Sequence, residues 1–259
     1  MPQNEIAKQW GDQGEALVFL HYFGGSAQSW NWVTEMLSDE YRCIAINLPG
    51  FGETKALNKP TIKGFSDFVQ KELKLLGIET YSLIGHSMGG KIAMQIAADA
   101  PKDTVKRLIL IAPSPPTTEP MPEKEKKRML HHPDRQEAEK TVESGIKKKL
   151  SQERHQLAVE TQLIIDQTTW KWWLEKGMDH SIAEYVAALE LPITVLASED
   201  DPVMTPDVIN ERVMTVLHSA ELINTKQTGH LIPMEDPDWI AEQIRRTMKP
   251  GNGKQDGIK

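Results

Sequence analysis

The chain has 259 residues, of which 39% are apolar and 26% charged, a composition typical of a globular protein with a sizeable core. Its 37 acidic residues outnumber the 30 basic ones, and the resulting formal charge of -7 argues against nucleic acid as a partner. No apolar run approaches the roughly 18 residues that a membrane span needs, so we expect no membrane partner. The single cysteine, Cys43, excludes an intrachain disulfide, and MPQNEIAKQW does not resemble a secretory signal, so we predict a cytoplasmic protein.

Short apolar runs alternate with segments of helical periodicity between residues 16 and 112. This alternation predicts an α/β fold, in which helices cover both faces of a mostly parallel central sheet. Helices are predicted over residues 28–37 and 65–76, where apolar side chains recur every three or four positions, and later over 206–217 and 237–248. The predicted strands are ALVFLHY from Ala16, RCIAIN from Arg42, YSLIGH from Tyr81, VKRLILIA from Val105, ITVLAS from Ile193 and AELINT from Ala220.

The region between residues 114 and 190 lacks strand-like runs and instead contains charged helical segments such as EKEKKRML and GIKKKLSQERHQLAVETQLII. It opens with the proline-rich SPPTTEPMP, which continues neither a strand nor a helix. We therefore predict a helical cap, residues 114–190, inserted into a core formed by residues 1–113 and 191–249. Residues 250–259 have no apolar anchor and are expected to form a flexible tail.

The most informative motif is GHSMGG, which directly follows a predicted strand and precedes the helical segment KIAMQIAADA. A sharp turn between a strand and a helix projects a serine hydroxyl away from the backbone, and flanking glycines provide the steric room for that turn. This context predicts that Ser87 is a nucleophile. The alternative is an ordinary glycine-rich connection between a strand and a helix.

A serine nucleophile needs a base and an anion that orients the base. His230, in the loop TGHLIPMEDP after the last predicted strand, is the strongest candidate base. The run SEDDP, after the strand ITVLA, supplies the acid, for which we favour Asp201 over the runner-up Asp200. In the alternative interpretation, these acids only initiate a turn and cap the following helix.

Acyl chemistry also requires donors for an oxyanion, and the loop HYFGGSAQSW follows the first long apolar strand. We predict that the backbone amides of Phe23 and Met88 form this oxyanion hole. The alternative is that Gly24 and Gly25 only make a tight turn. Trp170 and Trp173 in the cap are candidate linings of an apolar or aromatic substrate pocket, although aromatic residues at helical spacing more often hold two elements together.

Taken in order, HYFGGSAQSW, NLPGFGET, GHSMGG, SEDDP and TGHLIPMEDP resemble the α/β-hydrolase fold superfamily, over about residues 16–114 and 191–248. Within it, the chain is similar to small carboxylesterases and to cofactor-free haloperoxidases, which are esterases and perhydrolases. Two features depart from the family pattern. Tyr22 stands where glycine usually follows the histidine of the oxyanion loop, so its ring lies beside the site or turns away from it. Only about fifteen residues precede Ala16, where the family usually has two more strands, which suggests a shortened sheet.

The resemblance implies a serine hydrolase with the triad Ser87, Asp201 and His230, which cleaves a carboxylic ester of a small molecule without a metal or other cofactor. Tyr22 is a candidate substrate contact whose phenol could assist the oxyanion. Two alternatives remain open: a carbon–carbon bond hydrolase or lyase that uses the same triad, and a receptor that binds a small molecule without turnover. The sequence predicts neither the physiological substrate nor the oligomeric state.

Overall fold

The computed structural model describes residues 6–249, so the predicted flexible tail at 250–259 lies outside the described residues. A seven-stranded sheet with the order β1-β3-β2-β4-β5-β6-β7 forms its centre. All neighbouring strands run parallel except β1, which pairs antiparallel with β3. The α/β fold with a mostly parallel sheet is therefore confirmed. The strands are β1 (Ala7–Trp10), β2 (Ala16–Leu20), β3 (Arg42–Ile46), β4 (Tyr81–His86), β5 (Val105–Ile111), β6 (Ile193–Ser198) and β7 (Glu221–Thr225).

The strand β1 is absent from the sequence-based prediction. It forms an edge of the sheet and pairs with β3 from Ala7 opposite Ile46 to Trp10 opposite Cys43. Its four residues are half-buried or exposed, so they do not form the continuous apolar run that marks the central strands. Among residues 6–249, one strand therefore precedes β2 along the chain.

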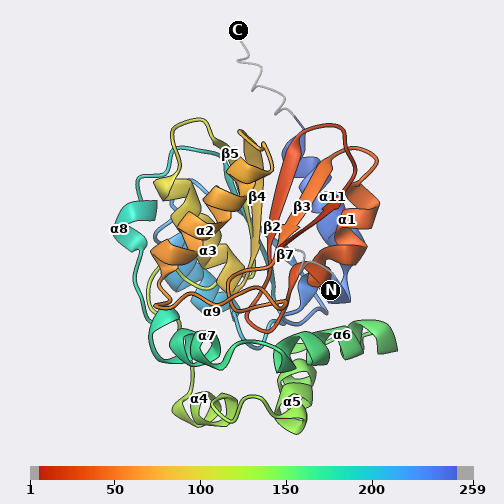
Figure 1. The fold of residues 1–259 in the computed structure, drawn as a ribbon, viewed down its shortest axis with the longest axis vertical. Helices are drawn as coiled ribbons and strands as arrows, with labels where there is room; N and C mark the ends of the chain where they lie inside the picture. The colour runs from red at the N-terminus through yellow and green to blue at the C-terminus, as the bar shows by residue number, and fades with distance from the viewer. Residues whose placement is uncertain (1–5, 250–259) are drawn as a thin grey trace, which may run out of the picture.

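Helices cover both faces of the sheet (Figure 1). Figure 1 shows α2 (Ile62–Leu75) and α3 (Met88–Asp99) on one face, and α1 (Asn31–Leu37) and α11 (Pro237–Met248) on the other. The helix α2 begins earlier than predicted because Thr61 caps it: the Thr61 side chain accepts a hydrogen bond from the Gly64 amide. The remaining core helices are the 3-10 turn η1 (Ala27–Trp30), α9 (Pro206–Val208), the π-helix η3 (Ile209–Met214) and α10 (Ile232–Glu235).

The segment between β5 and β6, here called the inserted segment (residues 114–190), contains helices and no strand. Figure 1 shows α4 to α7 gathered beyond one end of the sheet, whereas α8 lies beside α3. Side chains of Asp134, Ser151 and Asp166 cap three of these helices. Across residues 6–249, the helices are too short or too polar to cross a bilayer. The helices are α4 (Glu123–Met129), α5 (Arg135–Gly145), α6 (Gln152–Leu163), α7 (Gln167–Trp172), the π-helix η2 (Trp173–Gly177) and α8 (Ala183–Val186).

Two apolar clusters stabilise this arrangement. The larger one contains the buried central strands and the helices on both faces, and it extends to Trp170 and Trp173 of the inserted segment. The smaller one joins Tyr22, in the loop after β2, to α5, α6 and the start of α10. Each fully buried Leu, Ile, Val or Phe side chain contributes about 1.5–3 kcal/mol. The inserted segment is thus packed onto the carboxyl end of the sheet, where β2, β4, β6 and β7 all finish. The smaller cluster consists of Tyr22, Ala138, Val142, Leu150, Ala158, Val159, Leu231 and Met234.

Candidate active site

Ser87 occupies a strained turn between β4 and α3. Its backbone has φ 53° and ψ -117°, a conformation that residues other than glycine rarely adopt. A side chain at Gly85 would come within 2.5 Å of the Gly89 carbonyl oxygen, and one at Gly89 within 2.4 Å of the Leu20 carbonyl oxygen. The glycines of the motif are therefore required by contacts between backbone segments, and the turn presents the Ser87 hydroxyl at the carboxyl end of the sheet.

The structure brings together Ser87, His230 and Asp201, which come from three different loops. The Ser87 Oγ lies 2.9 Å from the His230 Nε2, and the His230 Nδ1 lies 2.8 Å from the Asp201 Oδ2. Asp201 is fixed in turn, since its Oδ1 accepts hydrogen bonds from the amides of Val203 (2.7 Å) and Met204 (2.9 Å). All three side chains are buried. The hydroxyl, imidazole and carboxylate thus form one continuous hydrogen-bonded chain.

The electrostatic interactions among these three side chains favour an ionised Asp201 beside His230. Burial alone raises the pKa of Asp201, but the adjacent His230 and the two backbone amides outweigh burial and lower it. For His230, burial lowers the pKa, but the charge and hydrogen bond of Asp201 raise it above its ordinary value. The imidazole is therefore a stronger base than an isolated buried histidine.

Asp200, the runner-up, does not contact His230. Its Oδ2 accepts a hydrogen bond of 2.8 Å from the Gln227 amide, and its Oδ1 lies 3.8 Å from the Lys147 ammonium. The structure therefore separates two adjacent acids that the sequence left as alternatives. Asp200 links the loop after β6 to the loop after β7, and Asp201 faces the histidine.

The histidine loop is held by two residues that the sequence analysis missed. The buried His86 ring donates a hydrogen bond of 2.8 Å from its Nε2 to the His230 carbonyl oxygen, and burial lowers the pKa of His86 to about 3, so it is neutral. Glu235 accepts a hydrogen bond of 2.8 Å from the Gly229 amide and two more, also of 2.8 Å, from the amides of Lys147 and Lys148. The loop is thus anchored to the inserted segment. No local motif marks either contact, because both join distant segments.

The loop after β2 is shaped by the buried His21. Its Nδ1 donates to the Tyr22 carbonyl oxygen (2.9 Å), and its Nε2 accepts from the Leu48 amide (3.2 Å). Burial lowers the pKa of His21 to about 4, so one neutral tautomer makes both bonds. Phe23, the first predicted amide donor, lies in this loop. The second, Met88, is the first residue of α3, where an amide has no partner within its own helix.

The three aromatic residues predicted to contact substrate are packed mainly against protein. The Trp170 ring stacks on Phe23 with centroids 4.1 Å apart, and its Nε1 donates to the Met129 carbonyl oxygen (2.7 Å). Trp173 lies next to the same phenylalanine, with centroids 6.0 Å apart. Tyr22 is buried in the smaller apolar cluster, between its own loop and α5 and α6. These contacts hold the inserted segment to the loop after β2, and contact with substrate stays a prediction for all three.

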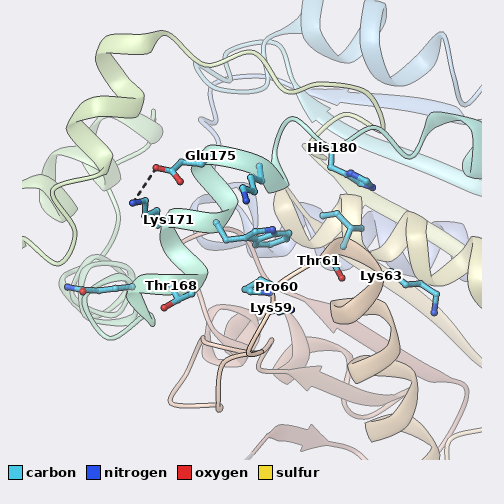
Figure 2. Close-up of a pocket in the computed structure, with 12 residues that line it drawn as sticks. Lys59, Pro60, Thr61, Lys63, Thr168, Lys171, Glu175 and His180 are labelled. Carbon is cyan, nitrogen blue, oxygen red and sulfur yellow. Dashed lines mark ion pairs between the residues drawn. The ribbon is translucent and has the colours of Figure 1, made fainter.

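A groove of about 920 Å³ lies between the start of α2 and the helices α7 and η2 (Figure 2). Its walls carry several basic side chains, and the only ion pair between lining residues joins Lys171 to Glu175 at 3.7 Å. The groove does not include Ser87, Asp201 or His230, so it is separate from the hydrogen-bonded chain. It is lined by Lys59, Pro60, Thr61, Ile62, Lys63, Gln167, Thr168, Lys171, Trp172, Glu175, Lys176 and His180.

Comparisons with known proteins bear on the fold and the family of the chain. The chain is 36% identical, over 104 residues, to the dihydrolipoyllysine-residue acetyltransferase component of the acetoin cleaving system of Cupriavidus necator, a match that covers 40% of this chain and only 28% of that protein. The structure of the present chain is similar to that of the esterase EaEST from Exiguobacterium antarcticum. The TM-score is 0.84, the identity is 15%, and the match covers 94% of this chain and 95% of the esterase.

The structure is also similar to that of the meta-cleavage product hydrolase CumD from Pseudomonas fluorescens, with a TM-score of 0.78, 18% identity and coverage of 93% and 92%. At these identities, the two structural similarities show a shared fold. A family model described as alpha/beta hydrolase fold matches residues 15–237, which is most of the chain. The chain therefore belongs to the alpha/beta hydrolase fold family.

Proposed function

We propose that the chain is a serine hydrolase that cleaves a carboxylic ester of a small, apolar or aromatic molecule through an acyl-enzyme intermediate. The proposal rests on one observation above all: the Ser87 hydroxyl, presented by a strained turn, is hydrogen bonded at 2.9 Å to an imidazole that is itself hydrogen bonded at 2.8 Å to a buried carboxylate. This is the constellation that activates a serine for attack on a carbonyl carbon.

In the first half-reaction, Ser87 Oγ attacks the ester carbonyl carbon and its proton passes to His230 Nε2. The new imidazolium is stabilised by Asp201, which accepts the Nδ1 hydrogen bond. Collapse of the tetrahedral intermediate breaks the bond to the alcohol oxygen, and His230 gives its proton to that leaving group. The product of this step is an acyl ester of Ser87 and a free alcohol.

In the second half-reaction, His230 removes a proton from water, which attacks the acyl carbon. Collapse of this second tetrahedral intermediate breaks the bond to Ser87 Oγ, which takes the proton back from His230, and releases the carboxylic acid. Both steps place negative charge on the former carbonyl oxygen. We assign its stabilisation to the backbone amides of Phe23 and Met88. The position of Met88 at the start of α3 supports this role because a helix amino terminus carries partial positive charge.

The aromatic residues Tyr22, Trp170 and Trp173 support the substrate class. Trp170 and Trp173 pack beside Phe23, and Tyr22 is buried in the smaller apolar cluster. We propose that the three side chains form an apolar wall that shapes the acyl or alcohol pocket. A wall of this kind favours substrates that bury apolar surface. The preferred length of the substrate is then set by the space between this wall and Ser87.

Hydrolysis of p-nitrophenyl esters of graded acyl length, followed by release of p-nitrophenol, tests the proposal. We expect turnover by the native chain, and a loss of about a million-fold in kcat on substitution of Ser87→Ala or His230→Ala if the residues act as one unit. A change of only a few-fold at Ser87 would reject the mechanism. Similarity to the meta-cleavage product hydrolase CumD keeps carbon–carbon bond hydrolysis as a second candidate, which the absence of turnover of every ester would favour.

A further inference from the structure

The strand β5 leads into the segment 114–119, which begins next to the backbone of Ser87. The Ser114 amide donates a hydrogen bond of 3.0 Å to the Ser87 carbonyl oxygen, so this segment begins in contact with the backbone of the proposed nucleophile. At its other end, the Glu119 amide donates to the Met178 carbonyl oxygen at 3.0 Å. The segment therefore connects the turn at Ser87 to the end of the π-helix η2.

Two polar atoms in this segment, the Thr117 Oγ1 and the Glu119 Oε2, are buried without a hydrogen-bond partner among residues 6–249, while the Ser114 side chain forms a hydrogen bond with the Glu119 carboxyl group. Ser114 is fully buried, and Glu119 is 6% exposed. More than nine in ten buried polar groups in proteins have a partner, and an unsatisfied one costs about 1–3 kcal/mol. Two such atoms, on a segment that contacts the backbone of the proposed nucleophile, point to a polar group that is supplied from outside the chain.

The buried cation that interacts electrostatically with Glu119 is Lys91, and it donates hydrogen bonds to other groups. Lys91, which is fully buried in α3, donates from its Nζ to the carbonyl oxygens of Thr117 and Met178, both at 2.9 Å. It therefore ties residues 117 and 178 of the inserted segment together, and these two hydrogen bonds direct its ammonium toward carbonyl oxygens. Burial raises the pKa of Glu119, whereas its hydrogen bond with Ser114 and the charges of Lys91 and His230 oppose that rise. The carboxyl group thus lies in the electrostatic range of both Lys91 and His230.

We propose that Glu119, together with the hydroxyls of Ser114 and Thr117, forms a polar subsite beside Ser87 that binds a hydrogen-bond donor of the substrate, such as a hydroxyl group. This inference rests on the proposed function and narrows its substrate class to esters that carry such a donor near the scissile carbonyl. A donor held by Glu119 would fix the orientation of the substrate as well as contribute to its selection. Glu119 is here a specificity residue.

Two pairs of esters that differ by a hydroxyl in place of a methyl group test the subsite. One pair varies the acyl side, p-nitrophenyl 3-hydroxybutanoate against p-nitrophenyl 3-methylbutanoate. The other varies the alcohol side, 2-hydroxypropyl butanoate against 2-methylpropyl butanoate. We expect kcat/KM of the native chain to favour the hydroxy ester at least about tenfold in one pair, because the methyl analogue would leave the buried acceptor unpaired.

Two substitutions connect that preference to Glu119. Glu119→Leu removes the acceptor and should abolish the preference, whereas Glu119→Gln keeps a neutral acceptor and should retain part of it. Glu123→Leu, on the exposed start of the neighbouring α4, is the matched control and should leave the preference unchanged. A purely structural role of Glu119 would alter the melting temperature and the rates of both esters of a pair alike, so the ratio separates the two roles.

Two results would overturn the subsite. The first is equal turnover within both pairs by the native chain, which would mean that the buried polar atoms are satisfied by solvent; the proposed function would stand. The second is a preference that persists in both Glu119 variants. No turnover of any of the four esters would instead reject the proposed ester hydrolysis, and this subsite with it.

Discussion

Replacing Asp201 by asparagine tests the orientation of the imidazole. In the native chain, the Asp201 Oδ1 accepts hydrogen bonds from two backbone amides, at 2.7 and 2.9 Å, and the Oδ2 accepts from His230. The amides would hold the carbonyl oxygen of asparagine, so its NH₂ group would face the His230 Nδ1. That nitrogen must then accept a hydrogen bond, and the proton moves to Nε2, which can no longer accept the proton of Ser87.

The expected loss is about ten-thousand-fold in kcat, or about 5–6 kcal/mol of transition-state stabilisation, because only the tautomer changes while the geometry is kept. The assay is p-nitrophenyl ester turnover at pH 8, with the melting temperature as a check of folding. Asp200→Asn is the matched control, since Asp200 contacts Gln227 and Lys147 and not the imidazole, and it should retain activity within a few-fold. Equal losses in the two variants, or a loss below tenfold for Asp201→Asn, would refute this reasoning.

Three further predictions follow from the geometry. Because Asp201 raises the pKa of His230 above its ordinary value of 6.5, and only the neutral ring accepts a proton, kcat/KM should rise with pH through a midpoint above 6.5; a midpoint well below 6 would contradict this. Gly89→Ala should unfold or strongly destabilise the chain, as measured by thermal melting, because the new methyl group would lie 2.4 Å from the Leu20 carbonyl oxygen. Cys43 is buried and its pKa is raised to about 12, so a thiol reagent should label it only after denaturation, and rapid labelling of the native chain would show that the strand opens.

Much of the fold follows from the sequence because the central strands of a parallel sheet are buried on both faces. All residues of β4, for example, are buried, so the strand appears in the sequence as a short and mostly apolar run. The edge strand β1 could not be predicted in this way, because its residues are half-buried or exposed and its partner β3 lies more than thirty residues further along the chain. The start of α2 was misplaced because the capping hydroxyl of Thr61 precedes the first apolar repeat.

The proposed site likewise contains residues that the sequence predicts and residues that it does not. Ser87 and His230 could be named because local motifs mark them, and the structure places the two side chains in contact. Asp201 and Asp200 are adjacent acids, and only the course of the loop after β6 decides which one faces the imidazole. Glu119 carries no local signal at all. A role for Glu119 can be inferred only from the structure, in which the start of the inserted segment contacts the turn that contains Ser87.

The central claim is that the Ser87 hydroxyl is an activated nucleophile, and covalent labelling with a fluorophosphonate tests it most directly. Intact mass spectrometry of the native chain should show a single added phosphonyl group, and peptide mapping should place it on Ser87. The Ser87→Ala and His230→Ala variants should remain unlabelled under the same conditions. Labelling that persists in Ser87→Ala, or a folded native chain that takes up no reagent, would contradict the account.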